Sequence, residues 1–152
     1  MNKLVLVIIF IITFWFSSKP GNESISQSDK ILVAAKILTV EDLAMRTTKY
    51  RVCDKIIRKA AHFSLYFMAG MGAFILTGSV GKSVLIVFLM GGIDEFHQYF
   101  VPGRGAQFTD VLIDTLGGTT GAVVTKLTIS NYKVLTAKSK KDGSLENYNA
   151  SR

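Results

Sequence analysis

Apolar residues along the chain gather into four stretches, separated by polar or glycine-rich segments. The clearest is residues 60–81, which carry no formally charged side chain and are bounded by Lys59 and Lys82. A membrane-spanning α-helix needs about 20 consecutive, mostly apolar residues, so this stretch predicts a transmembrane helix. The four stretches together predict an all-α, polytopic membrane helical bundle. Its expected spans are about 4–18, 60–80, 83–101 and 108–129.

The first apolar stretch follows a short start that contains Lys3. A secretory signal peptide has the same layout. However, no small-x-small cleavage site follows the stretch, and Trp15 suits the aromatic belt of a membrane interface. We therefore interpret residues 4–18 as a retained first span, with a cleaved signal peptide as the alternative.

Polar segments flank and connect these spans. Residues 20–29 are rich in Ser, Asn and Gly, which predicts a turn region. Residues 29–45 place apolar side chains at helical spacing between charged ones, which predicts an amphipathic helix on the membrane or the bundle. A solvated linker helix fits that pattern equally well. Residues 131–152 are rich in Lys, Ser and Asn, which predicts a disordered basic tail and leaves 1–130 as the single domain.

Glycines mark the turns and one helix surface. Residues 78–83 read Gly-Ser-Val-Gly-Lys-Ser, a tight turn that predicts an antiparallel hairpin of the second and third spans. In the fourth span, Gly117 and Gly121 have the Gly-x-x-x-Gly spacing that permits close helix approach, and Gly118 adds a second small position. We therefore expect this surface to face a neighbouring helix.

Charge is distributed unevenly around a formal net value of +7. Residues 60–125 contain two basic and four acidic side chains, whereas the flanking segments are basic. A basic periphery around an apolar centre suits anionic lipid headgroups. Nucleic-acid binding would need a folded basic face with aromatic readers, and the sequence shows none. Cys53 is the single cysteine, so no intrachain disulfide is expected.

Two adjacent acids, Asp94 and Glu95, follow the third apolar run. Residues 83–93 are too few to span a bilayer, so the third span must carry both acids to the lipid edge or deeper. Each ionised group at membrane depth costs roughly 2.5–3.5 kcal/mol on insertion scales, so such groups usually face a protein interior and have a function. A buried polar site is therefore predicted.

Helical periodicity predicts which polar residues converge on that site. In a hairpin bundle, the start of the second span, the end of the third and the start of the fourth share one membrane face. Those three places carry every candidate residue except Arg104, which lies in the connection between the third and fourth spans. The candidate residues are Arg58, His62, Tyr66, Asp94, Glu95, Gln98, Arg104, Asp110 and Asp114.

The motifs around these residues resemble the VanZ family. They are Arg58-Lys59-Ala60-Ala61-His62-Phe63, Asp94-Glu95-Phe96-His97-Gln98, Pro102-Gly103-Arg104, and Asp110-Val111-Leu112-x-Asp114. The resemblance implies a multipass membrane protein of the bacterial cell envelope, in a family whose founding member is linked to low-level teicoplanin resistance and which has no established reaction. Asp114 departs from the family pattern, which usually has Asn there, and this puts a neutral hydrogen-bonding role in doubt.

Three functions fit the candidate site. A binding or accessory role would use Arg58 and Arg104 to engage phosphate or carboxylate of a lipid or cell-wall precursor. A membrane-embedded hydrolase or transferase would use His62 as acid or base. A purely structural plug of ion pairs would fix helix order. No close pair of metal ligands such as His-Glu-x-x-His occurs, so neither a metal nor another cofactor is expected.

Two further expectations concern the orientation of the protein in the membrane and the partner of Arg104. The basic residues favour cytoplasmic N- and C-termini, which would place the polar site at the outer face of the membrane. Arg104 follows a Pro-Gly turn after the third span, so a short connection can fold it back over the acids. We expect Asp94 or Asp110 to hold it.

Overall fold

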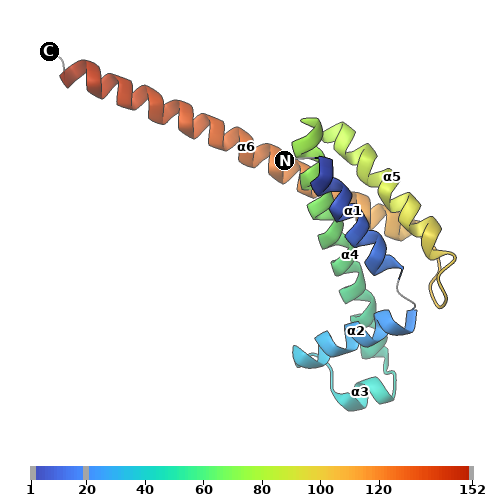
Figure 1. Cartoon of the computed structure of the whole chain (residues 1–152). Helices are drawn as coiled ribbons and strands as arrows, with labels where there is room; N and C mark the ends of the chain where they lie inside the picture. The colour runs from blue at the N-terminus through green and yellow to red at the C-terminus, as the bar shows by residue number, and fades with distance from the viewer. Residues whose placement is uncertain (1–2, 19–20, 151–152) are drawn as a thin grey trace.

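The computed structural model describes residues 3–18 and 21–150, and every regular element in this part of the chain is a helix. The predicted all-α class is therefore confirmed. The helices are α1 (Lys3–Ser17), α2 (Gly21–Ala34), α3 (Val40–Ala44), α4 (Thr48–Thr77), α5 (Val80–Gln98) and α6 (Phe108–Ala150). Figure 1 shows α1, α4, α5 and the first part of α6 packed as a bundle, with α2 and α3 beside the start of α4.

The central helix α4 begins earlier than the sequence predicts, at Thr48 rather than near residue 60. The Thr47 side chain caps its N-terminus by accepting a hydrogen bond from the backbone N–H of Tyr50. It ends at Gly78, whose φ of 65° is the left-handed conformation that glycine adopts without strain. By length and composition, α4 is the one described helix that could cross a membrane.

The segment between α1 and α4 differs from the predicted turn and single amphipathic helix. Residues 21–34 form α2, and the helix predicted over 29–45 is interrupted after Ala34. Lys36 has a φ of 56° there, which no α-helix interior accommodates. A reciprocal capping box between Thr39 and Asp42 then starts the short α3. Local capping chemistry thus divides the segment in a way that apolar spacing alone does not reveal.

The predicted disordered tail is also corrected for the described residues, because α6 continues as one helix to Ala150. Residues 131–139 are exposed, and Figure 1 shows this half of α6 leaving the bundle. The stretch lacks proline and contains Ala, Leu and Lys, whose intrinsic helix propensity is high. Residues 151–152 of the predicted tail lie outside the described part.

Close approach of α6 to α4 determines the centre of the bundle. A Cβ at Gly117 would lie 2.5 Å from the Phe63 carbonyl oxygen, and one at Gly121 would lie 2.0 Å from that of Phe67. Backbones in contact at this distance leave no room for a side chain. A Cβ at Gly118 would instead meet Val87 of α5, so adjacent glycines of α6 face both neighbouring helices.

The apolar core follows from this arrangement. Beside the glycine contacts, Tyr66 and Ala69 of α4 pack on Val87 and Met90 of α5, with Phe10 of α1 at the edge. A second, smaller core lies where α2 and α3 cover the start of α4. It is built from Leu32, Leu38 and Tyr50, with Leu43, Cys53 and Ile57 around them. The polar site lies beyond the first core, toward the end of α5.

Candidate functional site

A polar cleft opens where the first half of α4, the 99–107 connection and the start of α6 meet. Its volume is about 430 Å³. On the α4 side of the cleft, Asp54, Arg58 and His62 are spaced by four residues and therefore share one helix face. The full lining is Asp54, Lys55, Arg58, Lys59, His62, Gln98, Gly103, Arg104, Gly105, Gln107, Asp110, Ile113 and Asp114.

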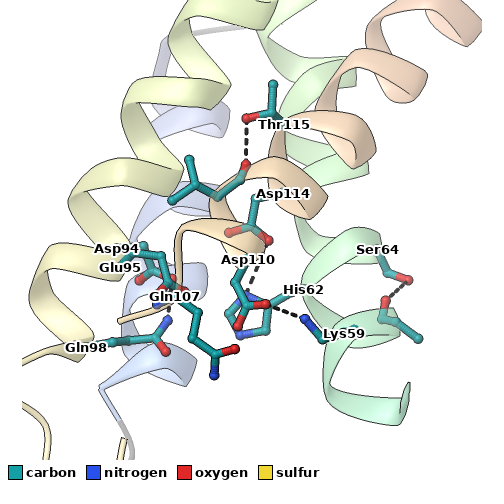
Figure 2. A network of polar contacts seen from close by, with 12 residues as sticks. Lys59, His62, Ser64, Asp94, Glu95, Gln98, Gln107, Asp110, Asp114 and Thr115 are labelled. Atoms are coloured by element: carbon teal, nitrogen blue, oxygen red, sulfur yellow. Dashed lines mark hydrogen bonds and ion pairs between the residues drawn. The ribbon is translucent and has the colours of Figure 1, made fainter. Parts of the chain in front are cut away.

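The floor of the cleft is formed by His62 of α4 and Asp114 of α6. The His62 Nδ1 and Asp114 Oδ1 atoms are 3.4 Å apart, and the Asp114 side chain is 0% exposed. Figure 2 shows the Asp114 carboxylate pointing toward the imidazole. Gly91 of α5 lies against Asp114 on the third side: a Cβ on Gly91 would be 3.4 Å from the Asp114 Cβ. Three helices therefore hold this pair.

A chain of hydrogen bonds leads from Arg104 into the bundle. Arg104 Nη1 donates to Gln98 Oε1 at 3.3 Å, and Gln98 Nε2 donates to Asp94 Oδ2 at 3.0 Å. Asp94 is buried, with an exposed fraction of 1%. The expectation that Asp94 or Asp110 binds Arg104 directly is thus corrected, since Gln98 lies between Arg104 and Asp94. The side-chain amide can fill this place because it donates and accepts at once.

Glu95 fixes the connection that follows α5. Its Oε2 accepts a hydrogen bond of 2.7 Å from the backbone N–H of Gln107, twelve residues later in the chain. A carboxylate that accepts from a backbone N–H makes a charge-assisted bond, stronger than a neutral one. Glu95 therefore positions the 99–107 connection and with it Arg104, instead of lining the cleft.

Two basic residues of α4 already have acidic partners. Lys59 Nζ binds Asp110 Oδ1 across to α6. Arg58 forms a two-pronged pair with Asp54 on its own helix, at 3.0 and 2.7 Å. Asp110 thus belongs to the cleft rim, whereas Asp114, one helical turn later on α6, lies on the floor.

Tyr66 and His97 remain apart from the cleft lining. Tyr66 is 1% exposed and lies one turn beyond His62, in the apolar core. Its hydroxyl has no hydrogen-bond partner among the described residues. His97 packs its ring on Phe14 of α1, with ring centroids 4.2 Å apart.

Sequence reasoning missed several residues of the cleft. Lys59 was interpreted as the boundary of a span, although it lies three residues before His62 and therefore on the same helix surface. Asp54 could have been found by extending the spacing of four from His62 through Arg58. Gln107 gave no such signal, because its contribution comes from backbone geometry in the connection.

Comparison with known proteins gives one match. The sequence model of the family described as VanZ/LLP1 matches residues 3–129, which include every candidate residue of the cleft. No curated protein matches significantly. No solved structure does so either.

Proposed function

Because the chain belongs to the VanZ/LLP1 family, a membrane-associated family, we propose that it is a multipass protein of the bacterial cell envelope that binds an anionic headgroup. The ligand class is a membrane lipid or lipid-linked cell-wall precursor that carries phosphate. Binding would occur in the cleft between α4, the 99–107 connection and α6. An altered susceptibility to teicoplanin is the cellular effect that the family resemblance suggests.

Outward-facing apolar stripes support several spans in addition to α4. On α1, α5 and α6, large apolar side chains recur every three or four residues and are exposed. They are Leu4, Val7, Ile11 and Trp15 on α1; Leu85, Leu89, Ile93 and Phe96 on α5; and Phe108, Leu112 and Leu116 on α6. Lipid contact would cover such stripes, whereas water would not favour them.

The acids of α5 do not argue against a span, because Asp94 and Glu95 are both buried in the bundle. The 19 residues of α5 extend about 28 Å at 1.5 Å per residue, close to the thickness of a bilayer core. Intramembrane acids characteristically face a protein interior in this way.

The arrangement of the helices supports the expected topology. Figure 1 shows α1 starting at the end of the bundle where α4 turns into α5 and where α6 leaves. Both ends of a four-span bundle would then lie on one side of the membrane. With cytoplasmic termini, the cleft would open toward the outer face, where cell-wall precursors are used.

The observation that carries the proposal is the set of cations around the cleft. Four basic side chains line it, from Lys55, Arg58, Lys59 and Arg104, against three carboxylates. Arg104 forms no ion pair within the described residues, and its Nε has no hydrogen-bond partner there. Burial lowers the pKa of Arg104, and the positive charge of nearby Arg58 lowers it further. An anion bound near both guanidinium groups would relieve their repulsion and use the remaining donors.

Lipid binding to the purified protein tests this proposal. Native mass spectrometry would compare phosphatidylglycerol with zwitterionic phosphatidylcholine for the unaltered protein and Arg104→Gln. We expect preferential binding of the anionic lipid and about a tenfold loss in Arg104→Gln, since a hydrogen bond to a charged group contributes about 1.5–3 kcal/mol. Lys49→Gln is the matched control, because Lys49 is exposed and pairs with Asp42 outside the cleft. Equal losses in the two variants would contradict a cleft-specific headgroup site.

Growth on teicoplanin tests the cellular part. A strain that depends on this chain for tolerance would be complemented with the unaltered protein or with Arg104→Lys. Lysine keeps the charge but loses the planar fork that binds two oxygens of one phosphate. We expect normal abundance in the membrane with reduced tolerance. Full tolerance from Arg104→Lys at equal abundance would count against bidentate recognition.

A second function, hydrolysis or group transfer on a lipid-linked substrate, is favoured by the His62–Asp114 contact on the floor of the cleft. An imidazole beside a buried carboxylate is suited to general acid–base chemistry. Release of a headgroup from a native lipid extract, lost in His62→Gln, would support this function. A purely structural plug would show neither turnover nor selective lipid binding.

A further inference from the structure

We propose that His62, Asp94 and Asp114 bind one divalent transition-metal ion, Zn²⁺ or Mn²⁺, at the floor of the cleft. The three residues come from three different helices, α4, α5 and α6. One potential ligand atom from each lies within 4.8 Å of the other two. This arrangement was not expected from the sequence, where no local ligand pair occurs.

The distance between His62 and Asp114 fits two ligands of one ion better than a hydrogen bond. Their Nδ1 and Oδ1 atoms are 3.4 Å apart, yet neither has a hydrogen-bond partner of acceptable geometry. Two ligand atoms that each lie about 2.1 Å from a tetrahedral ion are separated by about 3.4 Å. The third ligand needs only a shift of its side chain, because 4.8 Å is the outer limit of the group.

The burial of Asp114 independently indicates a ligand. Its side chain is 0% exposed, and both carboxylate oxygens lack a hydrogen-bond partner in the described part of the chain. A buried carboxylate without a partner costs several kcal/mol, roughly the effective penalty for an uncompensated ion. Figure 2 shows the group directed at His62, toward the middle of the proposed site.

Charge balance leads to the same conclusion. Asp94 and Asp114 bring two negative charges to a buried place, and two basic side chains of α4 are already paired with other acids. Lys59 is paired with Asp110, and the Arg58 guanidinium with Asp54. A divalent cation with two carboxylates and a neutral imidazole forms a group of zero net charge, which suits a buried position.

The surroundings of Asp94 resemble the outer layer of known metal sites. Gln98 donates to Asp94 Oδ2, and Arg104 in turn donates to Gln98, so the carboxylate is oriented from outside the site. Hydrogen bonds of this kind fix the direction of metal-binding side chains. The bond uses one oxygen of Asp94 and is compatible with coordination by the other.

The ligand types select the class of metal. An imidazole suits Zn²⁺ and related transition metals, whereas carboxylates also suit Mn²⁺. Three protein ligands leave at least one coordination position open, as in catalytic zinc sites. That position would face the cleft, because His62 and Asp114 line it. Contact between the ion and a phosphate oxygen would rest on the proposed headgroup binding, but the metal site itself does not.

Metal titration of the full-length protein tests the proposal. The protein would be purified in dodecyl maltoside without added anionic lipid, treated with chelator and titrated calorimetrically with Zn²⁺ and Mn²⁺. We expect one equivalent to bind. Asp114→Asn should weaken binding at least about tenfold, since even changes in the outer layer of a metal site cost 10–100-fold. Glu41→Gln is the control, with the same carboxylate-to-amide change at an exposed position of α3 outside the cleft, and should bind normally.

Several results would overturn the inference. They are no stoichiometric binding by the unaltered protein, unchanged binding in Asp114→Asn, or equal weakening in Glu41→Gln. If Asp114→Asn does not fold, electron spin-echo spectroscopy of the Mn²⁺-loaded unaltered protein tests instead whether His62 coordinates the ion. Coupling to an imidazole nitrogen is expected from His62, and its absence would contradict the site. Failure of the lipid experiment alone would leave the metal result standing, so the two proposals are separable.

Discussion

Replacing Gly121 by alanine should separate α4 from α6. The new Cβ would lie 2.0 Å from the Phe67 carbonyl oxygen and 3.2 Å from the Met71 backbone nitrogen, whereas ordinary contact begins at 3.4 Å. The shortfall at the carbonyl is therefore 1.4 Å. Both obstacles are backbone atoms of α4, so no side-chain rotation can relieve the overlap, and one helix must move.

The expected destabilisation follows from two opposing effects. Overpacking a well-packed interface typically costs about 1–3 kcal/mol, and a backbone obstacle favours the upper end of that range. Alanine recovers about 0.5–1 kcal/mol of helix propensity relative to glycine. The net loss of unfolding free energy should therefore be about 2 kcal/mol.

Gly92→Ala provides the matched control. Gly92 lies within α5, and a Cβ added there meets nothing within 4 Å, so only the propensity gain of about 0.5–1 kcal/mol should remain. Both variants would be unfolded with sodium dodecyl sulfate in mixed micelles, and helicity would be followed by circular dichroism. Equal stability of the two variants would refute the close contact of α4 with α6.

Two further predictions concern topology and the 99–107 connection. In a Cys53→Ser background, an impermeant thiol reagent added outside the cell should modify Ser26→Cys and spare Lys140→Cys; the opposite pattern would place the cleft on the cytoplasmic side. Glu95→Gln should loosen the connection, because the charge-assisted bond to the Gln107 N–H is worth about 1.5–3 kcal/mol. Faster amide hydrogen exchange at Gln107 would show this, and unchanged exchange would contradict it.

Local signals in the sequence were sufficient for the helices of the bundle, α1, α4, α5 and α6, and their order. The long charge-free run of α4, the glycine at its end and the Pro-Gly stop after α5 act within a few residues, so the chain reveals them directly. Two predictions from the pattern of apolar residues were wrong, for the segment before α4 and for the tail. The break near Lys36 and the continued helix after residue 131 depend on capping and propensity, which a pattern of apolar positions does not represent.

The family assignment was likewise accessible from the sequence. The motifs around His62, Asp94 and Asp114 resemble those of the VanZ family, and the VanZ/LLP1 match over residues 3–129 confirms that resemblance. Helical periodicity also indicated that the start of the second span, which lies within α4, would meet the end of α5 and the start of α6. Periodicity specifies which face of a helix a residue occupies, and hairpin connections specify which ends are neighbours.

Only the tertiary structure decided the pairing inside the cluster. The sequence offered Arg104 two carboxylates, Asp94 and Asp110, and the structure places Gln98 between Arg104 and Asp94. It also assigns Lys59 to Asp110 and leaves His62 beside Asp114. The Lys59–Asp110 and His62–Asp114 contacts both cross from α4 to α6, whose close approach the glycines at 117 and 121 permit. Such distances arise from packing between helices, and no residue encodes them alone.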